Sequence, residues 1–277
     1  MKTVTLPSGT KVPALGQGAW NMGDDRSKRA EEIATLRLGI DLGMTLIDTA
    51  EMYGDGRSEQ LIAEATAGRR GEVFIVSKVL PNNASRRGTV SACERSLKNL
   101  KTDHIDLYLL HWRGGVPFSE TIEALQGLQR SGKIRHYGVS NLDLGELREW
   151  WKYAGGEACA ANQLLYNLTR RGIEWDLLPW LRERRVPVMA YSPLEQARLT
   201  RNAKFVAYAK HEGIAPMQMA LAWLLRRDDV IVIPKSSRRE HVKENAAACD
   251  ITLTTAQLAE LDKLFAPPSR ASALEML

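Results

Sequence analysis

The sequence contains few cysteines and no cysteine pairs. Cys93, Cys159 and Cys249 are scattered, odd in number and lack the short spacings of metal-binding motifs. Neither a disulfide framework nor a bound metal is therefore expected. Isolated cysteines of this kind are typical of proteins that work in a reducing compartment.

Long apolar runs and blocks of like charge are also missing. No run approaches the roughly 18 apolar residues of a membrane span, and the first seven residues lack the apolar core of a signal peptide. Lysine and arginine are interspersed with aspartate and glutamate, and the net charge is +5. These features predict a cytoplasmic protein that binds neither membranes nor nucleic acid, although it can attract small anions.

Glycine-rich phosphate-binding loops are the third feature that the sequence lacks. Neither G-x-G-x-x-G nor a complete P-loop motif, G-x-x-x-x-G-K-[ST], occurs in the chain. A phosphate-cradling loop of either kind is thereby excluded.

Short apolar runs alternate with amphipathic stretches along all 277 residues, of which 44% are hydrophobic and 26% charged. No linker or composition break divides them, so residues 1–277 are expected to form a single domain. The alternation predicts an α/β fold, a (β/α)8 TIM barrel with an N-terminal β-hairpin and an extra C-terminal helix. Strands are expected at 14–20, 46–48, 73–78, 105–110, 137–140, 158–163, 188–191 and 230–233. The expected helices include 58–67, 144–151, 173–185, 254–265, and 203–227 divided at Gly213 and Pro216.

Three of the expected strands end near residues that can hold charge or move protons. Asp48 ends the second strand and Tyr53 follows five residues later, Lys78 ends the third strand, and His111 follows the fourth. In a barrel the carboxyl ends of the strands meet at one rim, where active sites form. Each residue alone could be a capping acid, a packed tyrosine, a snorkelling lysine or a satisfied histidine. Together they predict a catalytic site.

The chain resembles the aldo-keto reductase family, of the bacterial type that reduces small carbonyl compounds. The resemblance covers nearly the whole length. It rests on the four residues above and on the segments 138–141, 162–163, 190–194 and 233–236. It implies NADPH-dependent reduction of a carbonyl to an alcohol, with the nicotinamide cofactor bound in extended form and without a glycine-rich loop.

These four residue types suit that chemistry. Negative charge gathers on the carbonyl oxygen as it is reduced, so an acid must deliver a proton there. Tyr53 is the expected acid, and Lys78 is expected to lower its pKa from about 10 by roughly one to three units. Asp48 would hold the lysine in place, and His111 would donate a hydrogen bond to the carbonyl.

The resemblance also implies cofactor contacts at the ends of the later strands. Ser140, Asn141 and Gln163 would bind the carboxamide of the nicotinamide, and Tyr191 would stack on its ring. The neighbouring cofactor residues would be Ser192, Pro193 and Leu194. The expected loop around the 2′-phosphate consists of Lys235, Ser236, Ser237 and Arg238, and the expected adenine contacts are Glu244 and Asn245.

Two positions depart from the family pattern. His241 stands where the pattern usually places an arginine on the phosphate, and Arg238 can substitute for it. The stretch 164–167 replaces a Glu-x-His-Pro run common among many members. The first departure makes the preference for NADPH an expectation to be tested.

The substrate mouth is expected to be short and partly aromatic. By resemblance Trp20 and Trp112 line it, while Arg113 could either attract acidic or phosphorylated substrates or simply be solvated. The segments 113–116, 195–202 and 266–277 are short, which favours small aldehydes or dicarbonyls such as methylglyoxal. We expect a monomer that binds a small-molecule carbonyl substrate.

Two other functions fit the same fold. The barrel also serves as a cofactor-binding regulatory subunit of potassium channels, although the complete set of four residues favours an enzyme. A strand-end lysine such as Lys78 can also form a Schiff base, as in barrel lyases. Trapping with borohydride in the presence of a carbonyl substrate separates the second case.

Overall fold

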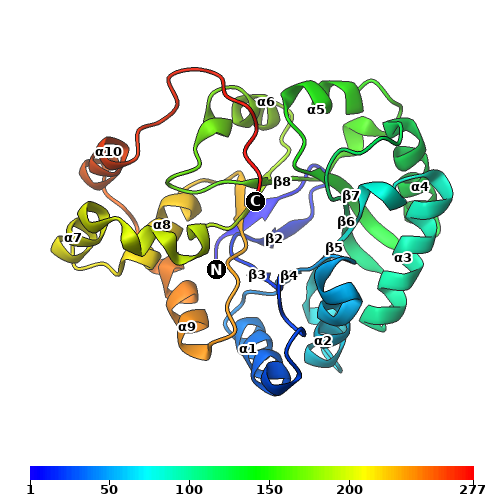
Figure 1. Ribbon diagram of the computed structural model, residues 1–277, viewed down its shortest axis with the longest axis horizontal. Helices are drawn as coiled ribbons and strands as arrows, with labels where there is room; N and C mark the ends of the chain where they lie inside the picture. The colour runs from blue at the N-terminus through cyan, green and yellow to red at the C-terminus, as the bar shows by residue number, and fades with distance from the viewer.

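The structure is a computed structural model that describes residues 1–277. Its centre is a parallel sheet in the order β10-β9-β8-β7-β6-β5-β4-β3. Bridges from Leu15 to Val232 and from Gly18 to Lys235 join the two edges, so the sheet closes into a barrel (Figure 1). The strands are β3 (Gln17–Gly18), β4 (Leu46–Asp48), β5 (Phe74–Val79), β6 (Ile105–Leu110), β7 (Ile134–Ser140), β8 (Asn162–Leu165), β9 (Val188–Tyr191) and β10 (Val230–Val232). The expected barrel is confirmed.

Helices surround the strands and cover their outer faces (Figure 1). They are α1 (Arg29–Asp41), α2 (Arg57–Ala65), α3 (Arg86–Leu100), α4 (Phe118–Arg130), α5 (Leu144–Trp150), α6 (Leu177–Glu183), α7 (Ala203–His211), α8 (Pro216–Leu225), α9 (Arg239–Ala247) and α10 (Thr255–Leu264). Because both faces of each strand are covered, most strand residues are buried; in β6 all six residues are buried, including Asp106. No helix is both long and apolar enough to span a membrane.

The two ends of the chain lie near the barrel axis in projection (Figure 1). The expected hairpin is present as β1 (Thr3–Thr5) paired antiparallel with β2 (Lys11–Pro13). The tail after α10 returns across the barrel (Figure 1), and the backbone of Leu277 lies close to Tyr191. Burial raises the pKa of Tyr191 to about 12, although the Leu277 backbone opposes that rise. The tail is short, as the sequence indicates, but it reaches the end of β9.

Several expected elements have different bounds. The first parallel strand, expected over 14–20, is reduced to Gln17–Gly18, and the fifth, expected over 137–140, already begins at Ile134. The sixth parallel strand begins at Asn162 and not at residue 158, because Gly156–Ala158 forms a 3-10 turn after the left-handed Gly155. The helix expected over 173–185 is divided into a 3-10 turn at Gly172–Glu174 and the shorter α6. The expected division of 203–227 into two helices is confirmed by α7 and α8.

The loop after β9 has an unusual backbone. Ser192, Glu195, Gln196 and Ala197 all have positive φ although none is glycine. Left-handed residues with a Cβ are strained, and such strain persists only where the surroundings fix it. The Glu195 carboxylate supplies that fixation, since it is buried and accepts hydrogen bonds from Asn167 at 2.8 Å and from Arg170 at 2.8 and 3.1 Å.

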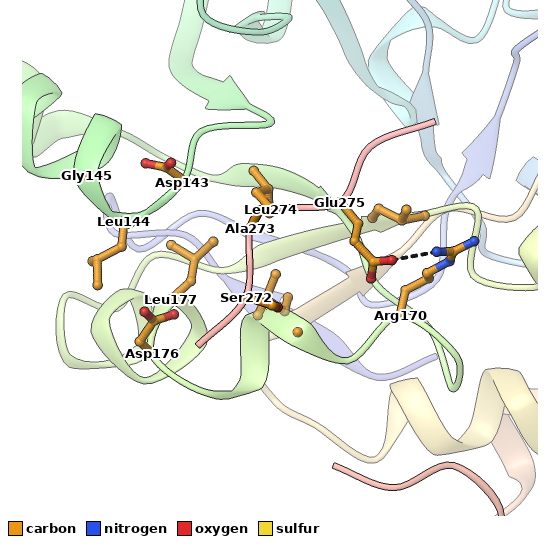
Figure 2. A pocket seen from close by; sticks show the side chains of 13 residues that line it. Asp143, Leu144, Gly145, Arg170, Asp176, Leu177, Ser272, Ala273, Leu274 and Glu275 are labelled. Atoms are coloured by element: carbon orange, nitrogen blue, oxygen red, sulfur yellow. Dashed lines mark hydrogen bonds and ion pairs between the residues drawn. The ribbon is translucent and has the colours of Figure 1, made fainter. Parts of the chain in front are cut away.

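A cavity of about 230 Å³ lies where the tail crosses the turn after β8 and the start of α5. Figure 2 shows Arg170 reaching from one side to Glu275 of the tail, at 2.5 Å. None of Asp48, Tyr53, Lys78 or His111 lines this cavity. Arg170 thus joins the tail to the loop after β9 through Glu275 and Glu195.

Gly138 in β7 provides a test of the barrel packing. An added Cβ would lie 2.5 Å from the carbonyl oxygen of Ala161 in the neighbouring chain segment. We expect Gly138→Ala to lower the free energy of unfolding by roughly 1–3 kcal/mol, because the backbone must shift. Gly127→Ala in α4 is the matched control, since only the flexible Arg130 side chain comes within 4 Å of its added Cβ. It should stabilise by about 0.5–1 kcal/mol. Equal denaturation midpoints for the two variants would contradict this packing.

Candidate active site

The ends of β4, β5 and β6 bring three of the four predicted residues to one rim. Lys78 Nζ lies 2.9 Å from Asp48 Oδ2 and 2.7 Å from the carbonyl oxygen of Thr49. The hydroxyl of Tyr53, in the turn after β4, lies 3.3 Å from the same nitrogen. The His111 ring stands edge-on to Tyr53, with 6.0 Å between the ring centroids. The structure therefore assembles all four side chains at one place.

Lys78 is completely buried and remains charged. Burial alone would lower its pKa, but the Asp48 carboxylate and the Tyr53 hydroxyl together outweigh burial and raise the pKa above its ordinary value. Asp48 is fixed from its other side, because Gln163 Nε2 donates to Asp48 Oδ1 at 2.7 Å. The pair is thus held within one hydrogen-bond network.

The pKa of Tyr53 differs from the sequence-based expectation, which was a lowered value. Burial raises it above 10; the Lys78 ammonium lowers it but offsets only part of that rise, and the Asp48 charge raises it further. The expectation was wrong because it weighed the neighbouring cation and not the desolvation of the phenolate. In the cofactor-free protein Tyr53 is a protonated phenol at neutral pH.

His111 is a neutral imidazole. Burial and, second, the charge of Lys78 lower its pKa to about 2. Its Nδ1 is buried and has no hydrogen-bond partner within the protein. A polar nitrogen of this kind is an unused hydrogen-bonding group beside Tyr53.

The candidates for the carboxamide contact form an internal network. Asn141 Nδ2 donates to the His111 carbonyl oxygen at 3.2 Å and to Ser140 Oγ at 3.1 Å, and the Tyr191 hydroxyl donates to Asn141 Oδ1 at 3.0 Å. Gln163 uses Nε2 on Asp48, while its Oε1 makes no hydrogen bond within the protein. Ser140, Asn141 and Gln163 are buried, and Tyr191 is partly buried beside them. Three strands thus contribute to one polar patch.

The segment 192–194 opens the strained loop after β9. Asn167 Nδ2 donates to the Ser192 carbonyl oxygen at 2.9 Å as well as to Glu195. Pro193 is buried, and Leu194 is partly buried against the core. Asn167, Arg170 and Glu195 were not predicted as site residues. The departure from the family pattern at 164–167 was the signal that could have found Asn167.

The segment 235–238 links β10 to α9, as expected. Lys235 Nζ donates to Ser237 Oγ at 2.7 Å, and Ser236 Oγ accepts from the Arg238 backbone N–H at 3.1 Å. Neither Lys235 nor Arg238 has a carboxylate within 4 Å. Burial lowers the pKa of Lys235. In α9, His241 and Glu244 are exposed and Asn245 is buried.

The aromatic candidates lie at different depths. Trp20 is 47% exposed after β3, and the Trp112 ring packs 4.7 Å from the His111 ring. Arg113 is paired with a carboxylate of the protein itself. Its guanidinium binds both oxygens of Glu149, at 2.8 and 3.2 Å, and lies 4.1 Å from the centre of the Phe118 ring. Its side chain is 32% exposed, and its role as a substrate contact stays a prediction.

The profile of the Aldo/keto reductase family matches residues 14–266. Methylglyoxal reductase YeaE of Escherichia coli is 48% identical over 281 aligned positions, which cover 100% of this chain and 99% of that protein. Glyoxal reductase of Bacillus subtilis is 31% identical, covering 95% and 92%. A crystal structure of an aldo-keto reductase from Klebsiella pneumoniae in complex with NADPH superposes with a TM-score of 0.97 at 48% identity, covering 100% and 99%.

The depressed pKa of His111 makes stability depend on pH. The folded protein keeps this ring neutral down to a pKa of about 2, whereas the unfolded chain protonates it near 6.5. Its contribution to stability is therefore complete above pH 6.5 and is lost as the pH falls. Between pH 7 and pH 5 we expect cofactor-free protein to lose about 2 kcal/mol more stability than a His111→Asn variant. Urea denaturation at both pH values measures this, and equal losses would mean that the ring is protonated in the folded state.

Proposed function

The chain belongs to the aldo/keto reductase family, and from that premise we propose that it reduces small aldehydes, ketones or dicarbonyls to alcohols with NADPH, with Tyr53 as the general acid. The observation that carries the proposal is the contact between the protonated phenol of Tyr53 and the buried ammonium of Lys78 at 3.3 Å. Beside it lies the neutral imidazole of His111. This grouping presents only hydrogen-bond donors and positive charge to a carbonyl oxygen that becomes negative.

Each residue then has a definite part in the reaction. Tyr53 delivers its proton to the carbonyl oxygen. Lys78 stabilises the phenolate that remains, and its own position is fixed by Asp48 and the Thr49 carbonyl oxygen. His111 donates a hydrogen bond that orients the carbonyl and shares its developing charge. NADPH, when bound, supplies the hydride.

The residues present fit the cofactor at both of its ends. Lys235 and Arg238 lack carboxylate partners within 4 Å, so their charges are available to a phosphate, and they precede the N-terminus of α9. The polar patch of Ser140, Asn141 and Gln163 would hold the carboxamide, with Tyr191 stacked on the ring and the segment 192–194 beside it. Glu244 and Asn245 would contact the adenine.

The rim supports small, weakly charged substrates. Trp20 and Met52 expose apolar side chains after β3 and β4, and Trp112 packs beside His111. Arg113 is paired with Glu149, so an acidic substrate that bound to Arg113 would have to share or displace that carboxylate. Methylglyoxal and glyoxal, which are named for the E. coli and B. subtilis relatives, are the substrates to try first.

A Schiff-base mechanism at Lys78 is disfavoured by its electrostatics. An amine must be neutral to attack a carbonyl, and the pKa of Lys78 is raised in its pair with Asp48. The nitrogen is also completely buried. Lys78 is better suited to stabilise a charge than to form a bond.

Replacement of Tyr53 by phenylalanine removes the acid but little cofactor contact. We expect Tyr53→Phe to lower kcat for methylglyoxal reduction at least about 100-fold while the Kd for NADPH stays within a few-fold. Turnover is followed by NADPH absorbance and binding by cofactor fluorescence. Tyr108→Phe is the matched control, because Tyr108 loses the same hydroxyl from a fully buried position in the core. Retained turnover in Tyr53→Phe would assign the proton to another group.

The segment 235–238 can be tested with two substitutions that should change the affinity for NADPH in opposite directions. Lys235→Ala should weaken NADPH binding roughly tenfold or more, because it removes a charge-assisted bond to the 2′-phosphate, and should affect NADH less. His241→Arg should tighten NADPH binding at pH 7.5 by about fivefold, roughly 1 kcal/mol, with little change for NADH. Fluorescence titration of both cofactors decides the matter. Equal effects on the two cofactors would place the phosphate elsewhere.

A further inference from the structure

A carboxylate without a cation lies beside the proposed phosphate loop. The neighbouring acids each have a cationic partner: Asp24 pairs with Arg57 at 3.2 Å, Asp25 with Lys28 at 3.0 Å, and Glu31 with Arg239 at 2.9 Å. Glu32, in the first turn of α1, has no lysine, arginine or histidine nitrogen within 4 Å, although it is only 2% exposed. Its charge is therefore less compensated than those of its neighbours.

The partners of Glu32 are neutral donors. Its Oε2 accepts the backbone N–H of Gly23 at 2.9 Å, and its Oε1 accepts the hydroxyl of Ser237 at 3.3 Å. Ser237 Oγ in turn accepts from Lys235 Nζ at 2.7 Å. A single hydroxyl thus separates the buried carboxylate from the ammonium of the loop.

Two donors of the segment 235–238, Ser237 and Lys235, form a chain of hydrogen bonds that ends at Glu32. A serine hydroxyl can donate only one hydrogen bond, and Ser237 donates it to Glu32 Oε1 at 3.3 Å. Lys235 donates a hydrogen bond to the same hydroxyl. Burial lowers the pKa of Lys235, and the charge of Glu32 opposes that lowering. A phosphate that bound at Lys235 and Ser237 would compete with Glu32 for the Ser237 hydroxyl and with Ser237 for the Lys235 ammonium, and it would be repelled by the charge of Glu32.

We propose that Glu32 is a specificity-determining residue that reduces the preference for NADPH over NADH. The proposal rests on the proposed function, which places the 2′-phosphate at this loop. A dianionic phosphate feels the carboxylate more strongly than the neutral 2′-hydroxyl of NADH does. Glu32 therefore acts in the same direction as His241, which supplies no fixed charge where the family pattern usually has an arginine.

The test compares the Kd values of NADPH and NADH by fluorescence titration in the parent, Glu32→Gln and the control Glu31→Gln. Glu32→Gln keeps the side-chain shape and an acceptor for Gly23 but removes the charge. We expect it to tighten NADPH binding about fivefold and to leave NADH within about twofold. Glu31→Gln removes the same charge from the exposed neighbouring position and should leave both cofactors within about twofold.

Glu32→Asp separates charge from shape. It keeps the carboxylate and should give an NADPH to NADH affinity ratio nearer the parent than Glu32→Gln does. Three results would overturn the proposal. They are an affinity ratio that rises as much with Glu32→Asp as with Glu32→Gln, a ratio that Glu32→Gln leaves unchanged, and an equal loss of affinity for NADPH and NADH. If Glu32→Gln does not fold, two other measurements decide the proposal. Glu32→Asp should keep the NADPH to NADH affinity ratio near that of the parent, and Ser237→Ala should lose the dependence of that ratio on salt concentration. Failure of the proposed function would appear separately, as a parent protein that binds and oxidises neither cofactor.

Discussion

The buried pair of Lys78 and Asp48 is the interaction on which the rim depends. Removing two charges from water costs free energy, and the pair is stable because Lys78 Nζ and both carboxylate oxygens of Asp48 are hydrogen-bonded. Lys78 binds Asp48, the Thr49 carbonyl oxygen and Tyr53, and Gln163 binds the remaining oxygen of Asp48. Through these bonds the pair connects β4 and β5 with β8 on the other side of the barrel. Loss of either charge would leave the other buried and unpaired.

Burial, more than the charges of the pair, explains why the neighbouring groups are neutral. The same ammonium that favours a phenolate at Tyr53 disfavours an imidazolium at His111, and burial opposes charge on both. The result is a rim with one fixed positive charge, one phenol and one imidazole, all of which can stabilise or protonate an oxyanion. An arrangement of this kind acts before the reaction begins, because its dipoles need little reorganisation.

The strand-end residues could be predicted because they follow a simple rule. Short apolar runs ended at Asp48, Lys78 and His111, and parallel strands bring such ends together. The pKa of Tyr53 could not be predicted in the same way, since its direction depends on the depth of burial. The partner of Arg113 could not be predicted either, because Arg113 lies in the loop after β6 and Glu149 lies 36 residues further along the chain, in α5. Contacts between loops of different βα units leave no local pattern in the chain.

The loop after β9 shows how such a distant contact can serve binding. Each left-handed residue with a Cβ costs of order 1–3 kcal/mol, and this loop has four of them. The hydrogen bonds from Asn167 and Arg170 to Glu195 offset part of that cost, because they satisfy a carboxylate that is otherwise buried. A loop held in this way has little conformational entropy left to lose, and the proposed cofactor contacts at 192–194 would profit from that order. The departure at 164–167 then has a physical meaning: an asparagine with two donors and an acceptor fixes the next loop.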